Sequence, residues 1–217
     1  MRFFLYIAFT CFFYSSSFGQ ANTKTISHYV FPEFKKGSIL LNNGQIIETF
    51  LNYNSLTKEM IFEENDKRMA FAGSELGTID TVFISDRKFI PKQGIFVELL
   101  YQSKWELFIE YRCDLKEVGK EIGYGARSRT TNVTSYSSFY STGQLYDLKL
   151  PDIFEIRPNN YYWIRKNDEF TRIRSLRDLK RLYKDRKELF KTYSGEHKIK
   201  YNNKESIIQL IEYLESN

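Results

Sequence analysis

Residues 38–48 read SILLNNGQIIE, in which an Asn-Gly pair separates two runs rich in aliphatic residues. Such a pair between β-prone runs is typical of a two-residue type I′ hairpin, because both central residues of that turn need positive φ angles. We therefore expect two antiparallel strands joined by a type I′ turn at Asn43 and Gly44. The stretch marks the beginning of an antiparallel sheet and says nothing of function.

Further strand-like segments follow this hairpin as far as Arg112. The clearest is residues 104–112, KWELFIEYR, where large apolar residues alternate with charged ones. Because successive side chains of a strand point to opposite faces, Glu106 and Glu110 are expected on the solvated face. Residues 89–91, FIP, are expected to form at best an edge strand, since proline cannot donate to a β-ladder. Many short strands joined by brief turns favour an antiparallel sandwich or a small barrel.

The hydrophobic period changes after Ser175 from two to about 3.6 residues, which predicts helices in the rest of the chain. Ser175 is expected to cap the first helix, and Asn202 is expected to precede the last one, with Glu205 three places on. The predicted fold class is therefore α+β. An antiparallel β meander forms a sandwich or small barrel, and two or three C-terminal helices follow it.

Composition and periodicity divide the chain of 217 residues into four parts. A signal peptide at residues 1–19 is followed by an irregular leader at 20–36. A β-rich domain spans residues 37–172 and contains an excursion rich in Gly, Ser and Thr at 114–144. The helical C-terminal part, residues 173–217, is expected to pack on the sheet. Large side chains are interleaved in the excursion, which favours an ordered or half-ordered segment over a plain linker.

The first nineteen residues have the features of a secretory signal peptide. Arg2 precedes an apolar stretch that is too short to span a membrane easily, and small residues stand before Gln20. We expect cleavage before Gln20 and export of the mature chain to the periplasm, the outer envelope or the medium. An uncleaved membrane anchor and lipidation of Cys11 are alternatives. No transmembrane segment is expected in the mature chain.

The mature chain would keep a single cysteine, Cys113, and two histidines, His28 and His197. One thiol cannot form an intrachain disulfide, and these residues are too few for a His/Cys zinc site. We expect no metal ion and no cofactor, and the sequence assigns no catalytic residue. Cys113 is expected to be a small core residue, and both histidines are expected at the solvated surface.

Residues 157–200 hold fourteen Lys and Arg side chains against six Asp and Glu. The plainest interpretation is a solvated polar face on amphipathic helices. An anionic membrane surface or a polymer of the cell envelope is the alternative partner, because a basic face attracts anions. Nucleic acid is disfavoured as a ligand, since an exported protein rarely meets it.

Several stretches stand out beyond their periodicity: GSILLNNG at residues 37–44, IDTV at 79–82 with DRKFIP at 86–91, GYG at 123–125 and YYWI at 161–164. In this order they resemble a family of exported proteins of Gram-negative, Bacteroidota-type bacteria that has no assigned activity. The resemblance implies export. It supplies no catalytic or binding residue.

These observations favour a non-enzymatic envelope or secreted protein with a binding or structural role. Its contacts are expected to come from the excursion, where tyrosines can act as amphipathic anchors and arginines as charged contacts. The candidate binding residues are Tyr124, Arg127, Arg129, Tyr136 and Tyr140. The partner stays open between an envelope protein, a glycan and an anionic surface. The alternative function is a hydrolase of an envelope glycan or peptide, with carboxylates brought together by the fold.

Overall fold

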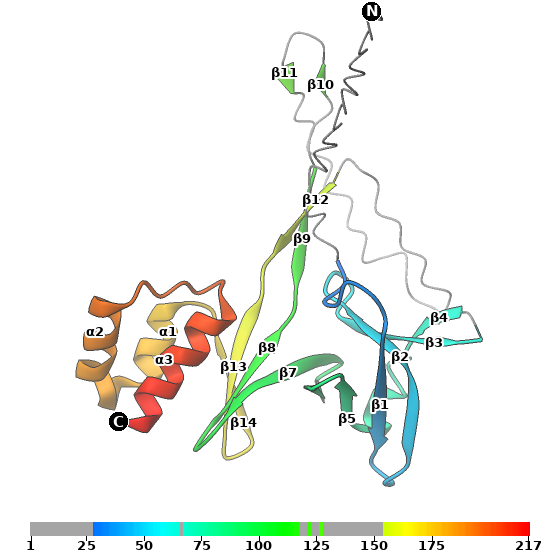
Figure 1. Ribbon diagram of the computed structural model, residues 1–217, viewed down its shortest axis with the longest axis horizontal. Helices are drawn as coiled ribbons and strands as arrows, with labels where there is room; N and C mark the ends of the chain where they lie inside the picture. Colours follow the sequence, from blue (N-terminus) through cyan, green and yellow to red (C-terminus); the bar gives the residue numbers. More distant parts are fainter. Residues whose placement is uncertain (1–27, 66, 118–120, 123–125, 128–153) are drawn as a thin grey trace, which may run out of the picture.

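The computed structural model describes residues 28–65, 67–117, 121–122, 126–127 and 154–217. It is mostly an antiparallel sheet of ten strands followed by three C-terminal helices (Figure 1). The sheet is open, with the strand order β14-β13-β8-β7-β6-β5-β1-β2-β3-β4, which confirms a sandwich-like α+β fold. The predicted signal peptide at residues 1–19 lies outside the described residues.

Most neighbouring strands of the main sheet are hairpin partners that follow each other in the chain. The exceptions are the pairs β1–β5 and β8–β13, which join segments far apart in the sequence. The ten strands are β1 (Lys35–Leu41), β2 (Ile46–Asn54), β3 (Glu59–Glu64), β4 (Lys67–Ala70), β5 (Ile79–Ile84), β6 (Arg87–Lys92), β7 (Ile95–Gln102), β8 (Glu106–Glu110), β13 (Tyr161–Lys166) and β14 (Glu169–Ile173).

Two further antiparallel pairs lie outside the main sheet. In Figure 1, β9 continues from β8 and β12 leads into β13, so that their pairing extends the ribbon that β8 and β13 form. The four strands are β9 (Cys113–Glu117), β10 (Glu121–Ile122), β11 (Ala126–Arg127) and β12 (Phe154–Pro158).

The turn between β1 and β2 differs from the expected type I′ turn. Gly44 has a positive φ of 84°, but Asn43 does not have a positive φ. The Gly44 amide donates to the Leu41 carbonyl at 2.9 Å, and the Leu41 amide donates to the Gln45 carbonyl at 2.9 Å. This is a type I turn followed by a glycine in the left-handed region, which forms a G1 bulge. The Asn43 side chain accepts a hydrogen bond from the Gln45 amide at 2.9 Å and so supports this turn.

Positive φ angles at both central residues occur instead in two other hairpins. Gln93 and Gly94, between β6 and β7, have φ angles of 48° and 84°. Asn167 and Asp168, between β13 and β14, have φ angles of 49° and 62°. Type I′ geometry matches the right-handed twist of the flanking strands, so these turns set the register of both hairpins.

Strand β6 lies in the middle of the sheet, between β5 and β7, and not at an edge as expected from its proline. The ladder with β5 covers only Arg87 to Phe89 of β6, so it ends before Pro91. On the other side Pro91 pairs with Phe96 of β7. A central strand accepts this proline because one of its two ladders has already ended.

Two hydrophobic cores lie along the sheet. The first core is built mainly from strands β1 to β3 and β5 to β7, with Leu51, Tyr53, Val82 and Phe89 fully buried. Phe31, which precedes β1, also packs into this core. The residues just before β1 thus contribute to the first core.

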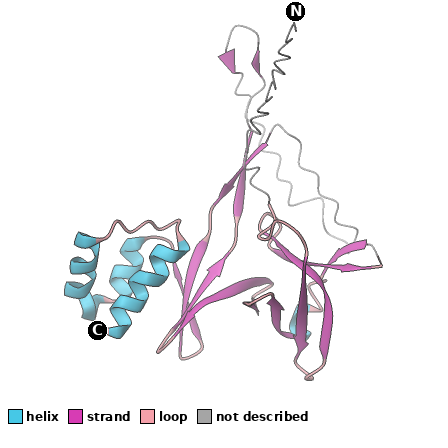
Figure 2. Ribbon diagram, in the orientation of Figure 1, coloured by secondary structure: helices cyan, strands magenta, loops and turns pink. Residues whose placement is uncertain are grey.

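The second core forms where the three helices pack together on β8, β13 and β14, apart from β1 and β2 (Figure 2). Its buried residues include Ile109 of β8, Tyr162 of β13, and Leu210 and Leu214 near the chain end. Tyr111 packs against both cores. The end of β8 is therefore the place where the two cores meet.

Three α-helices and two 3₁₀ turns complete the described structure. Ser175 Oγ accepts from the Asp178 amide at 3.3 Å, which confirms the predicted cap. The last helix is capped by Asn203 and not by Asn202, because Asn203 Oδ1 accepts from the Ser206 amide at 2.7 Å. Within the described ranges, no helix combines the length and the apolar composition needed to cross a membrane. The elements are η1 (Leu76–Thr78), α1 (Leu176–Leu182), η3 (Lys184–Arg186), α2 (Lys187–Glu196) and α3 (Lys204–Ser216).

Candidate functional site

Four of the five candidate binding residues, Tyr124, Arg129, Tyr136 and Tyr140, lie outside the described residues. The fifth, Arg127, lies in β11, which pairs with β10. The role of all five in binding stays a prediction. The described residues offer a different candidate, on the sheet itself.

A row of aromatic and basic side chains lies on the face of the sheet opposite the helices. Tyr162 of β13 belongs to the second core, and because side chains alternate along a strand, Tyr161 and Trp163 lie on the opposite face. Their rings are interleaved with cationic groups from neighbouring strands. We define the aromatic–basic face by eight residues: Lys92, Phe108, Arg112, Tyr161, Trp163, Arg165, Phe170 and Arg172.

Lys92 lies over the indole ring of Trp163, with Nζ 3.6 Å from the ring centroid. Trp163 Nε1 donates to Glu110 Oε2 at 3.0 Å, and Glu110 is only 4% exposed. Burial lowers the pKa of Lys92, and the negative charge of Glu110 opposes that shift. The expectation that Glu110 is solvated is therefore wrong, because Trp163 of the neighbouring strand packs against it.

Two arginines flank the ring of Tyr161. The guanidinium carbon of Arg112 lies 4.3 Å from the ring centroid, and that of Arg172 lies 5.1 Å from it. Arg112 Nη1 lies 3.8 Å from Glu110 Oε1, which is a long distance for an ion pair. Arg172 forms no ion pair with any residue that the structure describes. Its guanidinium carbon also lies 5.7 Å from the centroid of the Trp163 ring.

Arg165 contacts the remaining residues of this face. This residue forms an ion pair with Glu106 and lies 5.2 Å from the centroid of the Phe108 ring and 5.6 Å from that of Phe170. The hydrogen bond to Glu106 raises the pKa of Arg165. Cation–π contacts contribute about 0.5–1 kcal/mol each at exposed sites, so they hold the cationic groups in place while leaving them charged. Besides the carboxylates of Glu106 and Glu110, the charge of Asp168 also acts on this face, through Arg165.

A buried ion pair lies beside the meeting point of the two cores. Arg87 of β6 donates from Nε and Nη2 to the two carboxylate oxygens of Glu98 in β7, both at 2.7 Å. The Tyr111 hydroxyl donates to Glu98 Oε2 at 2.6 Å and accepts from Arg87 Nη2 at 2.9 Å. Burial acts to lower the pKa of Arg87, but the hydrogen bond and charge of Glu98 raise it overall. The three side chains therefore form a closed network in which the two charges cancel.

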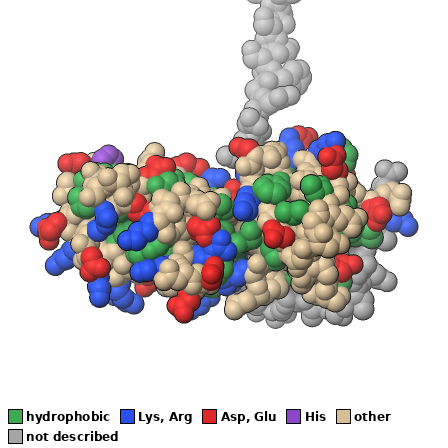
Figure 3. All heavy atoms as spheres, turned by 90° about the horizontal axis from the view of Figure 1, so that it is seen from below, with side chains coloured by type: hydrophobic (Ala, Val, Ile, Leu, Met, Phe, Trp, Pro, Cys, Tyr) green, Lys and Arg blue, Asp and Glu red, His purple; other side chains and the backbone are tan. Residues whose placement is uncertain are grey.

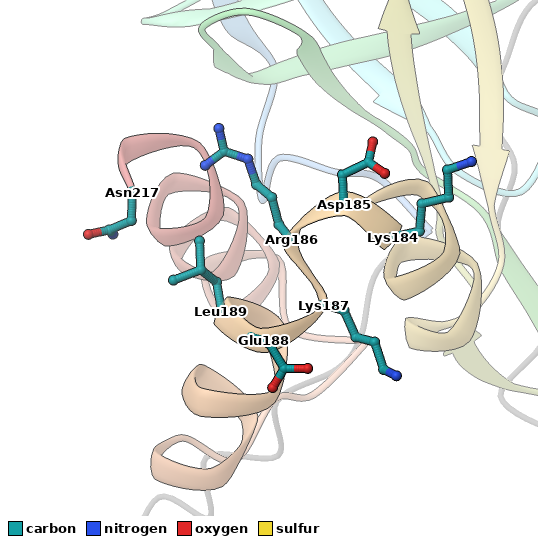
Figure 4. Close-up of a pocket in the computed structure, with 7 residues that line it drawn as sticks. All are labelled: Lys184, Asp185, Arg186, Lys187, Glu188, Leu189 and Asn217. Atoms are coloured by element: carbon teal, nitrogen blue, oxygen red, sulfur yellow. The ribbon is translucent and has the colours of Figure 1, made fainter.

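A hollow of about 420 Å³ lies beside the turn between α1 and α2. Figure 4 shows that the side chains around it splay apart, with Lys184 and Asp185 on one side and Glu188 on another. Arg186 donates to the carbonyl of Leu214 and so satisfies a backbone group near the end of α3. Because these side chains do not converge, the hollow is a weaker candidate than the sheet face.

Most of the basic residues within 157–200 lie in the helical part of the molecule, whereas Arg157, Arg165, Lys166 and Arg172 lie on strands. Figure 3 shows Lys and Arg side chains around this part, with Asp and Glu between them. Arg181, for example, lies 3.8 Å from Asp178. This distribution fits the interpretation of a solvated polar face.

His28 and Cys113 are both buried, at 8% and 9% exposure. Ser55 Oγ donates to the His28 carbonyl at 2.6 Å and lies 3.3 Å from Cys113 Sγ. Burial lowers the pKa of His28 and raises the pKa of the Cys113 thiol. Cys113 is thus confirmed as a core residue. The expectation of a solvated His28 is wrong, because the segment before β1 pairs with the end of β2 through Tyr29 and Asn54.

We expect Cys113 to react slowly with a thiol reagent such as DTNB in the folded protein. A buried thiol with a raised pKa is mostly protonated near neutral pH and is shielded from the reagent. With Cys11 changed to Ser, the labelling rate should be at least about tenfold lower in buffer than in urea. Equal rates under both conditions would contradict the burial of Cys113.

The aromatic–basic face was not among the sites expected from the sequence. Alternation along residues 161–165 was a usable signal, since it places Tyr161, Trp163 and Arg165 on one side of a strand. The order of the strands, which brings Lys92 over Trp163, has no such signal in the sequence. Comparisons of the chain with protein-family models, with curated proteins and with solved structures found no match.

Proposed function

We propose that the protein is a non-enzymatic binding protein of the cell envelope or the secreted fraction, and that its aromatic–basic face binds an acidic glycan. The observation that carries this proposal is the pair of arginines on the ring of Tyr161, of which Arg172 has no carboxylate partner among the described residues. The signal-peptide features of residues 1–19 support export.

The geometry suits a carboxylate-bearing ligand. A guanidinium group that lies against an aromatic ring still presents its N–H groups at its edge, where they can bind a carboxylate through two hydrogen bonds. The ring also restricts the arginine side chain before the ligand arrives, so less conformational entropy is lost on binding. Arg112 and Arg172 therefore form a prepared anion site.

A polymer fits this face better than a lipid surface does. Arg112, Tyr161 and Arg172 are all half-buried. A sugar unit of a polymer can reach these half-buried side chains, whereas a flat membrane surface would meet the more exposed charges of the helices first. Phe108 and Lys92, at 1% and 7% exposure, support this face from within. The favoured partner is thus an acidic polysaccharide.

The test uses soluble alginate as the carboxylate polymer and phosphatidylglycerol vesicles as the lipid surface. Arg172→Gln is expected to weaken binding to alginate by about tenfold or more, since a hydrogen bond to a charged group contributes about 1.5–3 kcal/mol. Arg177→Gln is the matched control, because it removes the same charge from an exposed position of α1. Affinity is measured by isothermal titration calorimetry at fixed salt concentration.

Three results would contradict the proposal. Equal losses in Arg172→Gln and Arg177→Gln would show diffuse attraction and no site on the sheet. Binding to the vesicles without binding to alginate would favour an anionic surface as the partner. Shortening of the alginate chains, measured by size-exclusion chromatography, would favour the alternative of a hydrolase.

A further inference from the structure

A cleft of about 290 Å³ lies where the two cores meet. Arg87 and Tyr111 line it from the sheet, and Asn160 and Tyr162 line it from the start of β13. Residues 202–205, which lead into α3, line its other side. Because Tyr162 points to the helix-bearing face, this cleft and the aromatic–basic face are on opposite sides of the sheet. It is therefore a separate candidate site, independent of the proposed function.

The sheet side of the cleft is already ordered. Glu98, which is 3% exposed, holds Arg87 through two hydrogen bonds and Tyr111 through a third. The Arg87 guanidinium also stacks 4.2 Å from the centroid of the Phe31 ring. Its bonds to Glu98 and Tyr111 use Nε and Nη2, so Nη1 keeps its donors. Both polar side chains on this side are thus fixed before any ligand binds.

The charges of the cleft cancel. Arg87 is balanced by Glu98, and on the opposite side Lys204 is followed directly by Glu205. An isolated anion or cation would gain little net attraction from such a set. Neutral ligands are therefore favoured over charged ones.

The cleft offers both donors and acceptors beside apolar surface. Asn202 has an exposed amide, which can donate and accept at once, and it makes no hydrogen bond with any other described residue. The Tyr111 hydroxyl keeps one acceptor lone pair after its two hydrogen bonds. Val30 and Ile109 add aliphatic surface. A ligand that matches this lining has several hydroxyl groups and an apolar C–H face.

We infer that the cleft binds a single neutral sugar unit. Each hydroxyl of a sugar can donate and accept, as the lining requires, and the ring's C–H groups can contact Val30, Ile109 and the tyrosine rings. The volume lies at the lower end of the range for ligand pockets, which is about 300–1,000 Å³, so one ring fits and a longer oligosaccharide does not. The amide side chain of Asn202 contacts the sugar hydroxyls at the mouth.

The test is saturation-transfer difference NMR on the full chain with four probes. Methyl glucoside and N-acetylglucosamine are the neutral sugars, and glucuronate and glucosamine are their anionic and cationic counterparts. In the Arg172→Gln variant, at least one neutral sugar is expected to bind, and more tightly than both charged ones. Asn202→Ala is expected to weaken that binding by about fivefold, the loss of one neutral hydrogen bond. Gln209→Ala, which removes an exposed amide of α3 outside this cleft, is expected to leave sugar binding unchanged.

Each outcome bears on the inference. No signal from either neutral sugar would overturn the inference, and so would tighter binding of a charged sugar to the Arg172→Gln variant, in which the anion site of the aromatic–basic face is weakened. Equal effects of Asn202→Ala and Gln209→Ala would also overturn it, since the sugar would then bind elsewhere. Arg172→Gln should leave sugar binding unchanged because Arg172 is on the other side of the sheet, so failure of the alginate experiment and failure of this one are distinguishable.

Discussion

Changing Glu98 to Gln is expected to lower the free energy of unfolding by about 3–5 kcal/mol. Glu98 is 3% exposed, and both of its carboxylate oxygens bind Arg87 at 2.7 Å. The variant would leave the Arg87 guanidinium charged and without a counter-charge between the two cores, which is costly because its side chain is only 21% exposed. Urea denaturation followed by tryptophan fluorescence measures the change.

Two controls separate charge burial from the loss of any ion pair. Lys36 and Glu48 form an exposed pair at 3.0 Å, so Glu48→Gln should change stability by no more than about 1 kcal/mol. Replacing both buried charges, by Arg87→Met with Glu98→Leu, should recover much of the loss, since no unpaired charge remains. If Glu98→Gln and Glu48→Gln behave alike, the network does not depend on charge compensation.

Changing Gly37 to Ala is expected to destabilise the protein by about 3 kcal/mol or more. A Cβ atom at this position would lie 2.3 Å from the carbonyl oxygen of Phe83 and 2.9 Å from Leu51 Cδ1. Gly37 sits in β1 between β2 and β5, and the nearest atom belongs to the backbone of β5. Relief of the clash would require the two strands to separate, which breaks their hydrogen bonds. Thermal unfolding followed by circular dichroism measures the loss.

Gly195 supplies the matched control for this substitution. It lies in the last turn of α2, and a Cβ atom there would meet nothing within 4 Å. Gly195→Ala should raise stability by about 0.5–1 kcal/mol, because alanine favours the helix and restricts the unfolded chain. If Gly37→Ala were tolerated as well as Gly195→Ala, the close approach of β1 and β5 would be contradicted.

Local patterns predicted the elements of this fold well. The alternation of residues 104–112 predicted β8, because apolar residues at every second position indicate a strand. Ser175 predicted the start of α1, because its side chain satisfies a free amide of the first turn. Both signals depend on residues that are close in the sequence. Such residues contact each other whatever the rest of the chain does.

The errors arose where contacts come from distant strands. Glu110 is buried because Trp163 of another hairpin packs on it, and no local pattern shows which strand will be the neighbour. Pro91 lies in a central strand because the ladder with β5 ends early, which depends on strand length and register. Asn43 was assigned the wrong turn type because its dipeptide permits both a two-residue turn and a G1 bulge.

The candidate sites were harder to predict than the fold. The aromatic–basic face unites Lys92 of β6 with Trp163 of β13, and the cleft unites Arg87 with Asn202 beside α3. Each pair is separated by a long stretch of chain, so spacing in the sequence carries no sign of it. The predicted contacts of the excursion, such as Tyr124 and Tyr140, lie outside the described residues and stay predictions.

The strand order also determines which strand pairings carry the largest entropic cost of loop closure during folding. Closing a hairpin such as β6–β7 orders only a short turn, whereas β1–β5 and β8–β13 each enclose a long loop of chain. Loop-closure entropy grows only with the logarithm of loop length, by about 0.6 kcal/mol for each doubling. The β8–β13 pairing therefore tolerates changes in the length of the chain between Glu110 and Tyr161 at little thermodynamic cost. Evolution can vary that connection while the helices keep their place on the sheet.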